Sequence, residues 1–506
     1  MRFSELVADI RPIKQDGVGE QQVAGLYYDS RQVVAGGLYF ALRGSRADGH
    51  DYLAAAAANG AVGAVVEDAA AVPAGLPYVQ VANARQTMAL LAATFYGVPT
   101  LAGPLVGITG TNGKTTTTFL VEGILNAAGI PAGVLGTISY RFGDIAIEAS
   151  HTTPESVELQ AALRQLADAG ARGYVMEVSS HALEQYRVDG CRFDVAIFTN
   201  LTRDHLDYHG TMESYLQSKL RLFSELLTPE RGKGVRTAVI NADDPAAAQF
   251  VAAAAGPTLT YGLAAGAAVT ARDISFSTSG IHGTLVTPLG ETALASPLLG
   301  RFNLSNLLAA AAAGVALRLP LAAIADGLHR HRTVPGRLES VPNECGITVL
   351  VDYAHTGDAL ENVLATLEEL KTGRLITVFG CGGDRDRGKR PVMGEIAVRR
   401  SDLAIVTSDN PRTEEPLAII ADIVAGIAPL GIREYGTELT AEQVPAKGYL
   451  VIPDRRAAIR AAISLANPGD IVVLAGKGHE DYQIIGTSKQ HFDDREEAAV
   501  ALREKG

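Results

Sequence analysis

One segment near residue 110 constrains the fold more than any other part of the chain. The segment GITGTNGKTTT, residues 107–117, joins an apolar run to a stretch of helical periodicity, so a buried strand should turn into a helix through Gly110 and Gly113. Backbone N–H groups at such a helix start favour phosphate oxygens, while Lys114 can reach a terminal phosphate and Thr115 a magnesium ion. A glycine-rich turn without a ligand would not need the Lys-Thr pair. The segment therefore predicts a nucleotide site.

The loop departs from the general nucleotide-binding pattern at one position. That pattern has a glycine separated by four residues from the Gly-Lys pair, and the corresponding residue here is Ile108. This difference argues against a motor protein or a GTPase. We therefore treat the loop as a distinct variant of the motif.

The length of the chain, 506 residues, exceeds what one hydrophobic core usually organises, and we expect an α/β protein of three domains. Short β-rich pieces and an Ala-rich helix predict a small N-terminal α/β domain, residues 1–101. Alternating strands and helices predict a central nucleotide-binding domain, residues 102–334, with a mostly parallel sheet covered on both faces. The same alternation predicts a Rossmann-like C-terminal domain, residues 335–506.

The apolar patterns also predict individual elements. In the central domain we expect strands at 105–109, 174–178, 194–200 and 237–241, helices at 115–128, 155–170, 211–227 and 304–317, and a β-rich patch near 259–290. In the C-terminal domain we expect strands at 347–353, 374–380, 402–408, 449–453 and 470–476.

Charge and composition exclude several classes of function. The formal net charge of −12 argues against general binding of nucleic acid, which needs a surplus of Lys and Arg. The three cysteines are too few and too scattered for a disulfide framework, which fits a reducing compartment. Acids interrupt the N-terminal segment MRFSELVADI, and the longest apolar run, residues 307–317, is too short to span a bilayer. We expect a cytoplasmic monomer that acts on small molecules, without membrane insertion.

The loop GTNGKTT resembles the ATP loop of the Mur ligases and of the related folylpolyglutamate synthetases. Further segments resemble Mur ligase motifs in the family's order, and together they cover nearly the full chain. They are HTTPES (151–156), MEVSSHALEQYRV (176–188), NLTRDHLDYHGTMESYLQSK (200–219), GRFNLSNLLAA (300–310), PGRLE (335–339), DYAHTGD (352–358), GGDRDRGKRP (382–391), SDNPR (408–412) and GKGHEDYQ (476–483).

This resemblance implies an ATP-dependent ligase of peptidoglycan precursor synthesis that forms an acyl phosphate and then an amide. It implies three domains, of which the first binds the uridine nucleotide, the second ATP and the third the incoming amino acid. The motifs are similar to those of the members that add meso-diaminopimelate to UDP-N-acetylmuramoyl-L-alanyl-D-glutamate.

The resemblance also implies residues that hold ATP and magnesium and that carry the reaction. The ATP residues are Gly110, Thr111, Asn112, Gly113, Lys114, Thr115, Thr116, Asn306, Arg337 and Asp352. The Mg²⁺ ligands are Thr115, Glu177, His205 and a carbamylated Lys219, because a carbamate turns a lysine into an anion that can coordinate the metal. The catalytic residues are Lys114, Lys219, His205, His355 and Lys389, the last two on loops that close over ATP.

Two further groups of residues are assigned to the substrates by the same resemblance. The uridine-nucleotide substrate is assigned to Ser30, Ser45, Arg46, Ala47, Thr152, Thr153, Ser179, Gln185 and Arg187. The diaminopimelate is assigned to Arg385, Asp409, Asn410, Pro411, Arg412, Gly476 and Glu480. The guanidinium of Arg412 can pair with the distal carboxylate that lysine lacks, and Glu480 is placed to meet the distal ammonium.

Three alternatives share parts of this pattern. A Mur ligase that adds L-lysine shares the chemistry, but lysine would leave Arg412 unpaired. A folylpolyglutamate synthetase-like ligase shares the loop, but it lacks the DNPR segment and a uridine-binding first domain. A nucleotide-binding regulator would use the loop as a switch without forming an amide.

Overall fold

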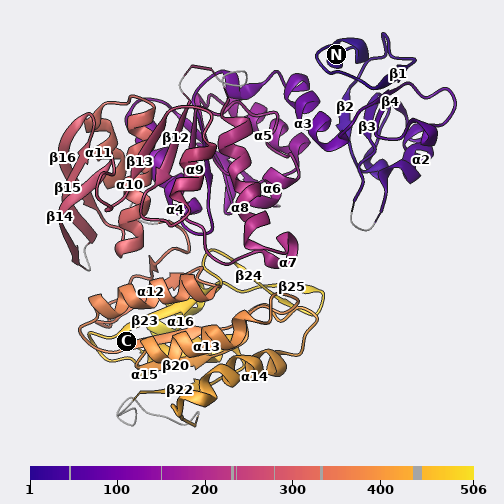
Figure 1. The fold of residues 1–506 in the computed structure, drawn as a ribbon. Coiled ribbons are helices and arrows are strands. Elements are labelled where there is room, and N and C mark those ends of the chain that lie inside the picture. The colour runs from indigo at the N-terminus through magenta and orange to yellow at the C-terminus, as the bar shows by residue number, and fades with distance from the viewer. Residues whose placement is uncertain are drawn as a thin grey trace.

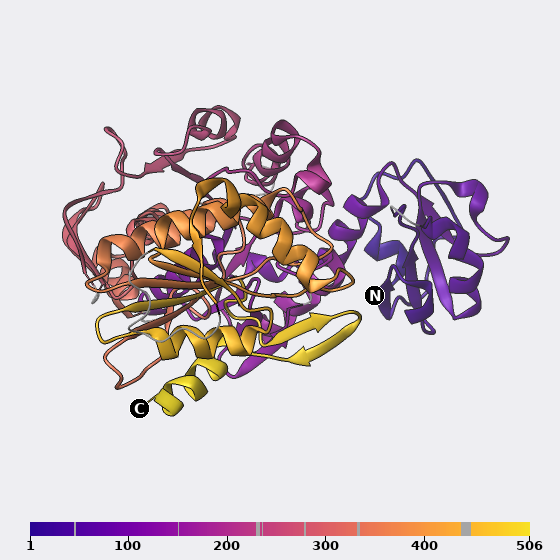
Figure 2. The ribbon, with the colours of Figure 1, turned by 90° about the horizontal axis from the view of Figure 1, so that it is seen from below.

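The computed structural model describes residues 1–44, 47–149, 151–228, 233–234, 236–277, 280–330, 334–436 and 447–505. Figure 1 shows three α/β bodies in chain order, with the N-terminal one beside the central one and the C-terminal one below it. Figure 2 shows the same arrangement from below, with the C-terminal body in front and the N-terminal body at the side. The three-domain α/β fold expected from the sequence is present.

The N-terminal domain is built on a five-stranded sheet of order β1-β5-β4-β3-β2, in which β1 is antiparallel to β5 and the other pairs are parallel. Apolar side chains form separate clusters on the two faces of this sheet. Its elements are α1 (Phe3–Leu6), β1 (Lys14–Asp16), β2 (Gly25–Tyr27), β3 (Gly37–Phe40), α2 (Leu53–Ala58), β4 (Ala61–Val66), β5 (Tyr78–Gln80) and α3 (Ala84–Phe95). Helix α3 packs against α5 of the central domain (Figure 1).

The central domain has an eight-stranded sheet of order β13-β12-β11-β6-β10-β7-β8-β9, parallel from β13 to β7. Its strands are β6 (Leu105–Thr109), β7 (Ala132–Leu135), β8 (Ser139–Phe142), β9 (Ile145–Glu148), β10 (Gly173–Glu177), β11 (Val195–Phe198), β12 (Thr237–Asn241) and β13 (Thr258–Tyr261). A separate antiparallel sheet contains β14 (Thr270–Ser277), β15 (Gly280–Thr287) and β16 (Gly290–Ser296). The antiparallel strands β8 and β9 were not predicted from the sequence.

Helices cover both faces of the central sheet, as predicted. They are α4 (Lys114–Ala127), α5 (Ser156–Asp168), α6 (Ser180–Glu184), α7 (Leu206–His209), α8 (Met212–Arg221), α9 (Ala247–Ala253), α10 (Arg301–Ala316) and α11 (Leu321–Arg330). The helix predicted at 211–227 ends its α-helical part at Arg221 and continues as a π-helix over Leu222–Leu226. The Ala-rich helix α10 is buried against α4 and α11, which accounts for its apolar sequence. Within the described ranges, every helix is too short or too polar to cross a membrane.

The C-terminal domain has a seven-stranded sheet of order β17-β18-β23-β19-β20-β22-β21, parallel except for β17. Its strands are β17 (Glu339–Ser340), β18 (Thr348–Asp352), β19 (Leu375–Phe379), β20 (Leu403–Val406), β21 (Arg433–Glu434), β22 (Gly448–Val451) and β23 (Ile471–Ala475). Its helices are α12 (Gly357–Leu370), α13 (Lys389–Arg400), α14 (Pro416–Ile427), α15 (Arg455–Leu465) and α16 (Asp494–Lys505). A hairpin of β24 (Tyr482–Ile485) and β25 (Ser488–His491) follows β23.

The parallel sheets determine where functional side chains gather. Strands β6, β10 and β11 are parallel neighbours, so the loops at their carboxyl ends meet at one edge of the central sheet. Strands β18, β19, β20 and β23 bring four more such loops together at one edge of the C-terminal sheet. Both edges carry residues that the sequence assigned to ligands.

Candidate active site

The phosphate loop, residues 110–113, connects β6 to α4 and needs glycine at two positions. Gly110 has a φ of +148° and Gly113 a φ of +85°, conformations that other residues rarely adopt. A Cβ atom on Gly110 would lie 1.9 Å from Oγ1 of Thr199, and one on Gly113 would lie 2.4 Å from Oδ1 of Asn306. The loop is therefore a tight cradle whose shape depends on both glycines, and it fits the phosphates of a nucleotide.

Asn200 holds this loop in place from the carboxyl end of β11. The backbone N–H of Thr111 donates to the carbonyl of Asn200 at 2.8 Å, and that of Asn112 donates to its Oδ1 at 2.9 Å. The hydroxyl of Thr111 lies 3.2 Å from that of Tyr215 on α8. Thr116 is buried in the first turn of α4. The sequence analysis did not assign Asn200, whose role depends on two strands being neighbours.

Asn306, assigned to ATP, contacts the loop from α10. Its Oδ1 faces Gly113 and accepts a hydrogen bond from the Thr117 hydroxyl at 3.4 Å. Its Nδ2 donates to Oδ1 of Asn303, one turn earlier, at 2.9 Å. These contacts fix the amide beside the start of α4.

Two lysines share one carbonyl of the loop. Nζ of Lys114 donates to the carbonyl oxygens of Gly110 at 2.9 Å and Thr111 at 2.7 Å. Nζ of Lys219, on α8, donates to the same Gly110 carbonyl at 3.0 Å and lies 4.3 Å from the centre of the Tyr215 ring. Burial lowers the pKa of both lysines, and the charge of Lys114 lowers the pKa of Lys219 further, well below its usual value. The cradle therefore contains an amine that favours its neutral form.

The proposed magnesium ligands lie around the same loop. Glu177, at the end of β10, is buried, and its two carboxylate oxygens accept hydrogen bonds from the backbone and hydroxyl of Thr137 at 2.9 and 3.0 Å. Each oxygen keeps a lone pair, so Glu177 and the Thr115 hydroxyl offer the oxygen donors that Mg²⁺ prefers beside phosphates and water. Among the described residues, no three His, Cys, Asp or Glu side chains form a metal cluster of their own. The donor set thus fits Mg²⁺ shared with a phosphate ligand.

His205 enters this region from the start of α7. Its backbone is in the left-handed region, with a φ of +54°, and its Nε2 lies 3.4 Å from Oδ2 of Asp204. Burial lowers the pKa of the imidazole. The negative charge of Asp204 raises the pKa of both Lys114 and Lys219 and partly offsets their burial. Asp204 was quoted within a motif but was not assigned a role.

Arg337 reaches the loop from the C-terminal domain. Its guanidinium donates to Oγ1 of Thr115 at 3.2 Å and lies 4.7 Å from the centre of the Tyr353 ring. Its Nε is buried without a hydrogen-bond partner in the described structure, which is unusual for a charged group. Such an orphaned donor at a phosphate cradle fits the assignment of Arg337 to the phosphates of ATP.

Asp352, at the end of β18, supports Arg337 indirectly. Its carboxylate accepts hydrogen bonds from the backbone N–H groups of Leu338 and Ala354, each at 2.8 Å, and so ties two loops together. Burial raises the pKa of this carboxyl group. In the described structure the Asp352 carboxylate holds backbone in place, and its assignment to ATP stays a prediction.

His355 and Lys389 lie next to each other. Nζ of Lys389, at the start of α13, donates to the carbonyl of His355 at 2.8 Å, and Nδ1 of His355 lies 2.9 Å from the carbonyl of Tyr353. Burial, followed by the charge of Lys389, lowers the pKa of His355 to about 4. The imidazole is therefore neutral near pH 7, and Lys389 supplies the positive charge of this pair.

The residues assigned to the peptide end of the uridine substrate form one hydrogen-bonded group in the central domain. The guanidinium of Arg187 donates to the carbonyl of Thr153 at 2.8 Å and to Oε1 of Gln185 at 2.7 Å. The Thr153 hydroxyl lies 3.4 Å from that of Ser179, and the Thr152 hydroxyl lies 3.1 Å from that of Thr137. This group adjoins Glu177, because the Thr153 hydroxyl also donates to the Glu177 carbonyl at 2.8 Å.

The remaining residues assigned to the uridine substrate belong to the N-terminal domain. Ser30 is buried, and its carbonyl accepts a hydrogen bond from the Asn59 side chain at 2.9 Å. The carbonyl of Ala47 accepts from the N–H of Gly44 at 2.9 Å. Ser45 and Arg46 lie outside the described residues. In the described part of the chain, neither Ser30 nor Ala47 is hydrogen-bonded to the Arg187 group.

The residues assigned to the amino acid follow β20 and β23 in the C-terminal domain. Nδ2 of Asn410 donates to Oε2 of Glu480 at 2.9 Å, and Gly476 has a φ of +116° beside the carboxylate of Asp409. The carbonyl of Pro411 accepts from the N–H of Glu414 at 3.1 Å. These residues therefore form one cluster, which we call the amino-acid pocket because of its assigned ligand, and the hairpin β24–β25 packs against it, since the N–H of Ile484 donates to Oδ1 of Asn410 at 2.9 Å.

Two arginines border this pocket. Arg412 has a φ of +52°, and its guanidinium donates to the carbonyl of Gly383 at 2.8 Å. Arg385 is exposed, and its guanidinium donates to the carbonyl of Asp384 at 3.3 Å. Both guanidinium groups are anchored by a carbonyl at these positions and keep further N–H donors for a carboxylate.

Lys477 lies within the pocket, although the sequence analysis did not assign it a role. Its side chain has no exposed surface, and its Nζ lies 3.4 Å from Oδ1 of Asp409, 3.2 Å from Oδ1 of Asn410 and 3.5 Å from Oε2 of Glu480. The GKGHEDYQ motif contained this lysine, but a lysine beside a glycine carries no local sign of burial.

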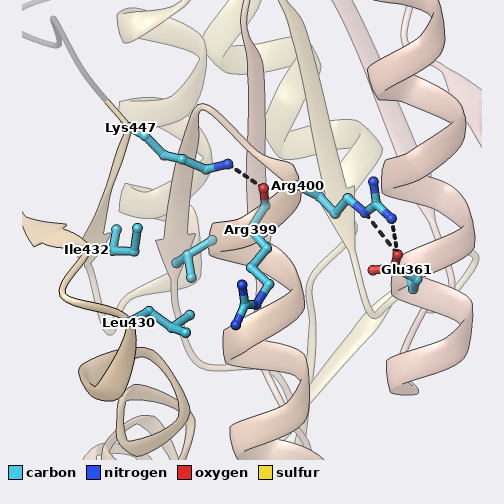
Figure 3. Close-up of a pocket in the computed structure, with 7 residues that line it drawn as sticks. Glu361, Arg399, Arg400, Leu430, Ile432 and Lys447 are labelled. Atoms are coloured by element: carbon cyan, nitrogen blue, oxygen red, sulfur yellow. Dashed lines mark hydrogen bonds and ion pairs between the residues drawn. The ribbon is translucent and has the colours of Figure 1, made fainter.

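Two cavities lie apart from the phosphate loop. One of about 460 Å³ in the C-terminal domain is lined by Glu361, Val398, Arg399, Arg400, Leu430, Ile432 and Lys447 (Figure 3). In Figure 3 Arg400 pairs with Glu361 and Lys447 donates to the Arg399 carbonyl, so its charged groups already have partners. The other, of about 240 Å³, lies where residues 297–299 of the central domain meet the C-terminal domain, and Arg337 lines it. Of the residues assigned from the sequence, only Arg337 lines either cavity.

Family models match most of the chain. They are the Mur ligase catalytic domain at residues 22–96, the Mur ligase middle domain at residues 108–314 and the Mur ligase glutamate ligase domain at residues 336–478. These matched ranges fall in turn on the N-terminal, central and C-terminal bodies of the fold.

Curated relatives match over the full length. A protein of Geobacter metallireducens is 62% identical over 100% of this chain and 99% of its own length, and one of Geobacter sulfurreducens is 61% identical over 99% of both. Both are named UDP-N-acetylmuramoyl-L-alanyl-D-glutamate--2,6-diaminopimelate ligase. A solved structure with the same name is 36% identical, with a TM-score of 0.71 over 100% of this chain and 99% of that chain.

A more distant solved structure shares the fold alone. Folylpolyglutamate synthase of Mycobacterium tuberculosis, complexed with ADP, is 20% identical, with a TM-score of 0.61 over 76% of this chain and 90% of that chain. This likeness extends the shared three-dimensional architecture to a chain of low sequence identity.

Proposed function

Because the chain belongs to the Mur ligase family, we propose that it is the ATP-dependent ligase that joins meso-diaminopimelate to the D-glutamate side-chain carboxylate of UDP-N-acetylmuramoyl-L-alanyl-D-glutamate. The full-length identity to relatives named for this reaction is the observation that carries the proposal. The product would be a precursor of peptidoglycan. We place the enzyme in the cytoplasm, which supplies ATP, and expect it to act as a monomer.

The reaction has two chemical steps. A carboxylate oxygen of the D-glutamate side chain attacks the γ-phosphorus of ATP, so that ADP leaves and an acyl phosphate forms. The amine of diaminopimelate then attacks the acyl carbon, phosphate leaves, and the amine loses a proton as the amide forms. Closure of the C-terminal domain over the central domain would exclude water that hydrolyses the acyl phosphate.

The residues around the phosphate loop support the first step. Lys114, Arg337 and Lys389 bring three positive charges to the region where the transferred phosphoryl group develops negative charge. Mg²⁺, when held by Thr115, Glu177 and His205, neutralises phosphate charge. In this proposal Asn306 and Asp352 position the rest of the nucleotide.

We further propose that Lys219 is carbamylated. Its buried amine favours the neutral form, and a neutral amine can attack the carbon of CO₂, forming an N–C bond and releasing a proton to water. The carbamate would place an anion beside the ammonium of Lys114, which is a favourable interaction. It would also provide an oxygen ligand for Mg²⁺.

The substrates would occupy the two remaining groups of residues. Arg187, held by Gln185 and the Thr153 carbonyl, is suited to bind an anionic part of the uridine substrate. Arg412 and Arg385 would pair with the distal carboxylate of diaminopimelate, and Glu480 with its distal ammonium. These assignments rest on the family motifs and on the clustering of the side chains.

Phosphate release tests the proposed function. With ATP and the UDP-linked dipeptide, meso-diaminopimelate should stimulate phosphate release and amide formation, whereas L-lysine and L-ornithine should not. Arg412→Ala should raise the KM for diaminopimelate about tenfold or more, because a charge-assisted pair is lost. Activity with L-lysine alone would indicate the lysine-adding function. ATP binding without any amide product would indicate a regulator.

A further inference from the structure

The amino-acid pocket contains more charged side chains than its proposed contacts with the ligand require. Asp409 and Glu480 place two carboxylates there, and Arg412 adds a guanidinium at its border. The charges of Glu480, Arg412 and Asp409 all contribute to the pKa of the Tyr482 hydroxyl, so these three groups lie near one ring. A fourth charge, the ammonium of Lys477, is buried between the two carboxylates.

The hydrogen-bond and ion-pair partners of the Lys477 ammonium all belong to this pocket. Its ammonium has three partners, on Asp409, Asn410 and Glu480, and it lies 5.7 Å from the centre of the Tyr482 ring. The nearest other buried pair, Arg455 with Asp494, is already neutral, with contacts of 2.6 and 2.8 Å and no exposure. Asp409, Glu480, Lys477 and Arg412 together therefore carry no net charge when all are ionised.

Lys477 also acts to lower the pKa of both carboxyl groups. Burial alone would raise the pKa of Asp409, but the charges of Lys477 and Arg455 hold it below its usual value. Burial and the charge of Asp409 raise the pKa of Glu480, while Lys477 acts in the opposite sense. Without Lys477, only Arg412 would offset the two carboxylates at close range, because Arg385 is exposed and its charge is screened by water.

We propose that Lys477 is a positioning residue that sets the charge specificity of the amino-acid pocket, because its ammonium offsets one carboxylate and so favours a ligand end without net charge. The inference rests on the proposed function, in which the distal end of meso-diaminopimelate carries one ammonium and one carboxylate. The distal end of lysine carries the ammonium alone. A pocket that lacks Lys477 is negative overall and favours the cationic end.

A pair of amino acids with the same shape and different charge tests this proposal. The two are meso-diaminopimelate and its analogue with a carboxamide in place of the distal carboxylate, whose distal end is a net cation. Steady-state kinetics near pH 7 give the ratio of kcat/KM for the acid to that for the amide, because the amine beside the carboxamide, with a pKa of about 8, is still mostly protonated there. Lys477→Met should lower this ratio about tenfold or more.

A compensated variant separates charge from packing. In Asp409→Asn combined with Lys477→Met the net charge of the pocket is again zero, so the ratio should return toward that of the wild type. Asp409→Asn alone makes the pocket positive and should raise the ratio. If Lys477→Met does not fold, Asp409→Asn alone tests the proposal, and an unchanged ratio of kcat/KM in this variant would overturn it.

The remaining outcomes are distinct. Equal losses for acid and amide in Lys477→Met, with the ratio unchanged, mean that Lys477 is only structural and overturn the inference while leaving the proposed function intact. A wild-type enzyme that forms an amide with neither amino acid overturns the proposed function itself, and this inference with it.

Discussion

Lys219 shows how its position changes the chemistry of a common side chain. Only 1% of the residue is exposed, and in the described part of the chain it forms no ion pair with a carboxylate. Its one hydrogen-bond acceptor is a loop carbonyl that it shares with Lys114, so two amines compete for the same oxygen. A lysine in such surroundings is more reactive than one on the surface, because more of it is neutral at a given pH.

We therefore predict that Lys219 takes up CO₂ near neutral pH. Protein supplied with ¹³C-bicarbonate should show a carbamate carbon by NMR that disappears in Lys219→Met. Because the pKa of this lysine is lowered, its amine becomes neutral, and the carbamate forms, at lower pH than on a surface lysine. The signal should be lost as the pH falls below that lowered pKa.

The matched control is Lys505→Arg, which changes a lysine in an exposed interaction with the Ser464 carbonyl. This variant should keep the carbamate signal and the activity, whereas Lys219→Met should lower kcat about a hundredfold, as expected on losing a group that organises transition-state charge. A signal that persists in Lys219→Met would contradict the assignment.

At the scale of elements, two of the ion pairs that join α15 and α16 lie in very different surroundings. Arg455 and Asp494 form one pair, which has no exposed side-chain surface, and the Arg455 guanidinium also donates to the Ala475 carbonyl at the end of β23. Arg456 and Glu497 form the other, in which the arginine side chain is 51% exposed. The buried pair lies directly beneath the loop that carries Lys477.

We predict that the two pairs differ strongly in stability. Asp494→Asn leaves the Arg455 charge buried without a counter-charge and should destabilise the protein by about 3–5 kcal/mol. The matched change Glu497→Gln should cost less than about 1 kcal/mol, because water solvates Arg456. Thermal unfolding of the full chain, followed by the midpoint of the first transition, measures both. Equal midpoints for the two variants would argue against the burial of the Arg455–Asp494 pair.

At the scale of the whole molecule, two arginines join the central domain to the C-terminal domain. Arg337, in the C-terminal domain, donates to Thr115 at the start of α4, directly after the phosphate loop. Arg301, on α10 of the central domain, pairs at 3.3 Å with Glu369 on α12 of the C-terminal domain, and its side chain is 69% exposed. Both contacts join the same two bodies, but only that of Arg337 lies at the cradle.

We predict that only the first of these contacts matters for nucleotide binding. Arg337→Ala should raise the KM for ATP about tenfold or more, and Arg337→Lys should recover it only in part, because lysine lacks the planar fork. Arg301→Ala should leave the KM unchanged, since an exposed pair contributes little. ATP titration followed by phosphate release measures all three variants. A similar rise in Arg301→Ala would show that general domain contact, and not the cradle, controls the affinity.

Local sequence patterns accounted for much of the fold. The apolar runs predicted β6, β10, β11 and β12 and the central C-terminal strands, because strands that are buried on both faces of a sheet are continuous apolar runs in the sequence. The glycine pattern of residues 107–117 likewise predicted a strand, a loop and a helix. The hairpin of β8 and β9 was not predicted, because its strands are only four residues long and lie between turn residues.

The arrangement of the site depended on contacts that no local pattern contains. Lys219 reaches Gly110 across 109 residues, and Arg337 reaches Thr115 across 222. Motif resemblance named these four residues, but it could not show that two lysines share a carbonyl or that Lys477 is buried between Asp409 and Glu480. A sequence pattern constrains neighbours along the chain, whereas burial and charge pairing arise only when distant segments pack together.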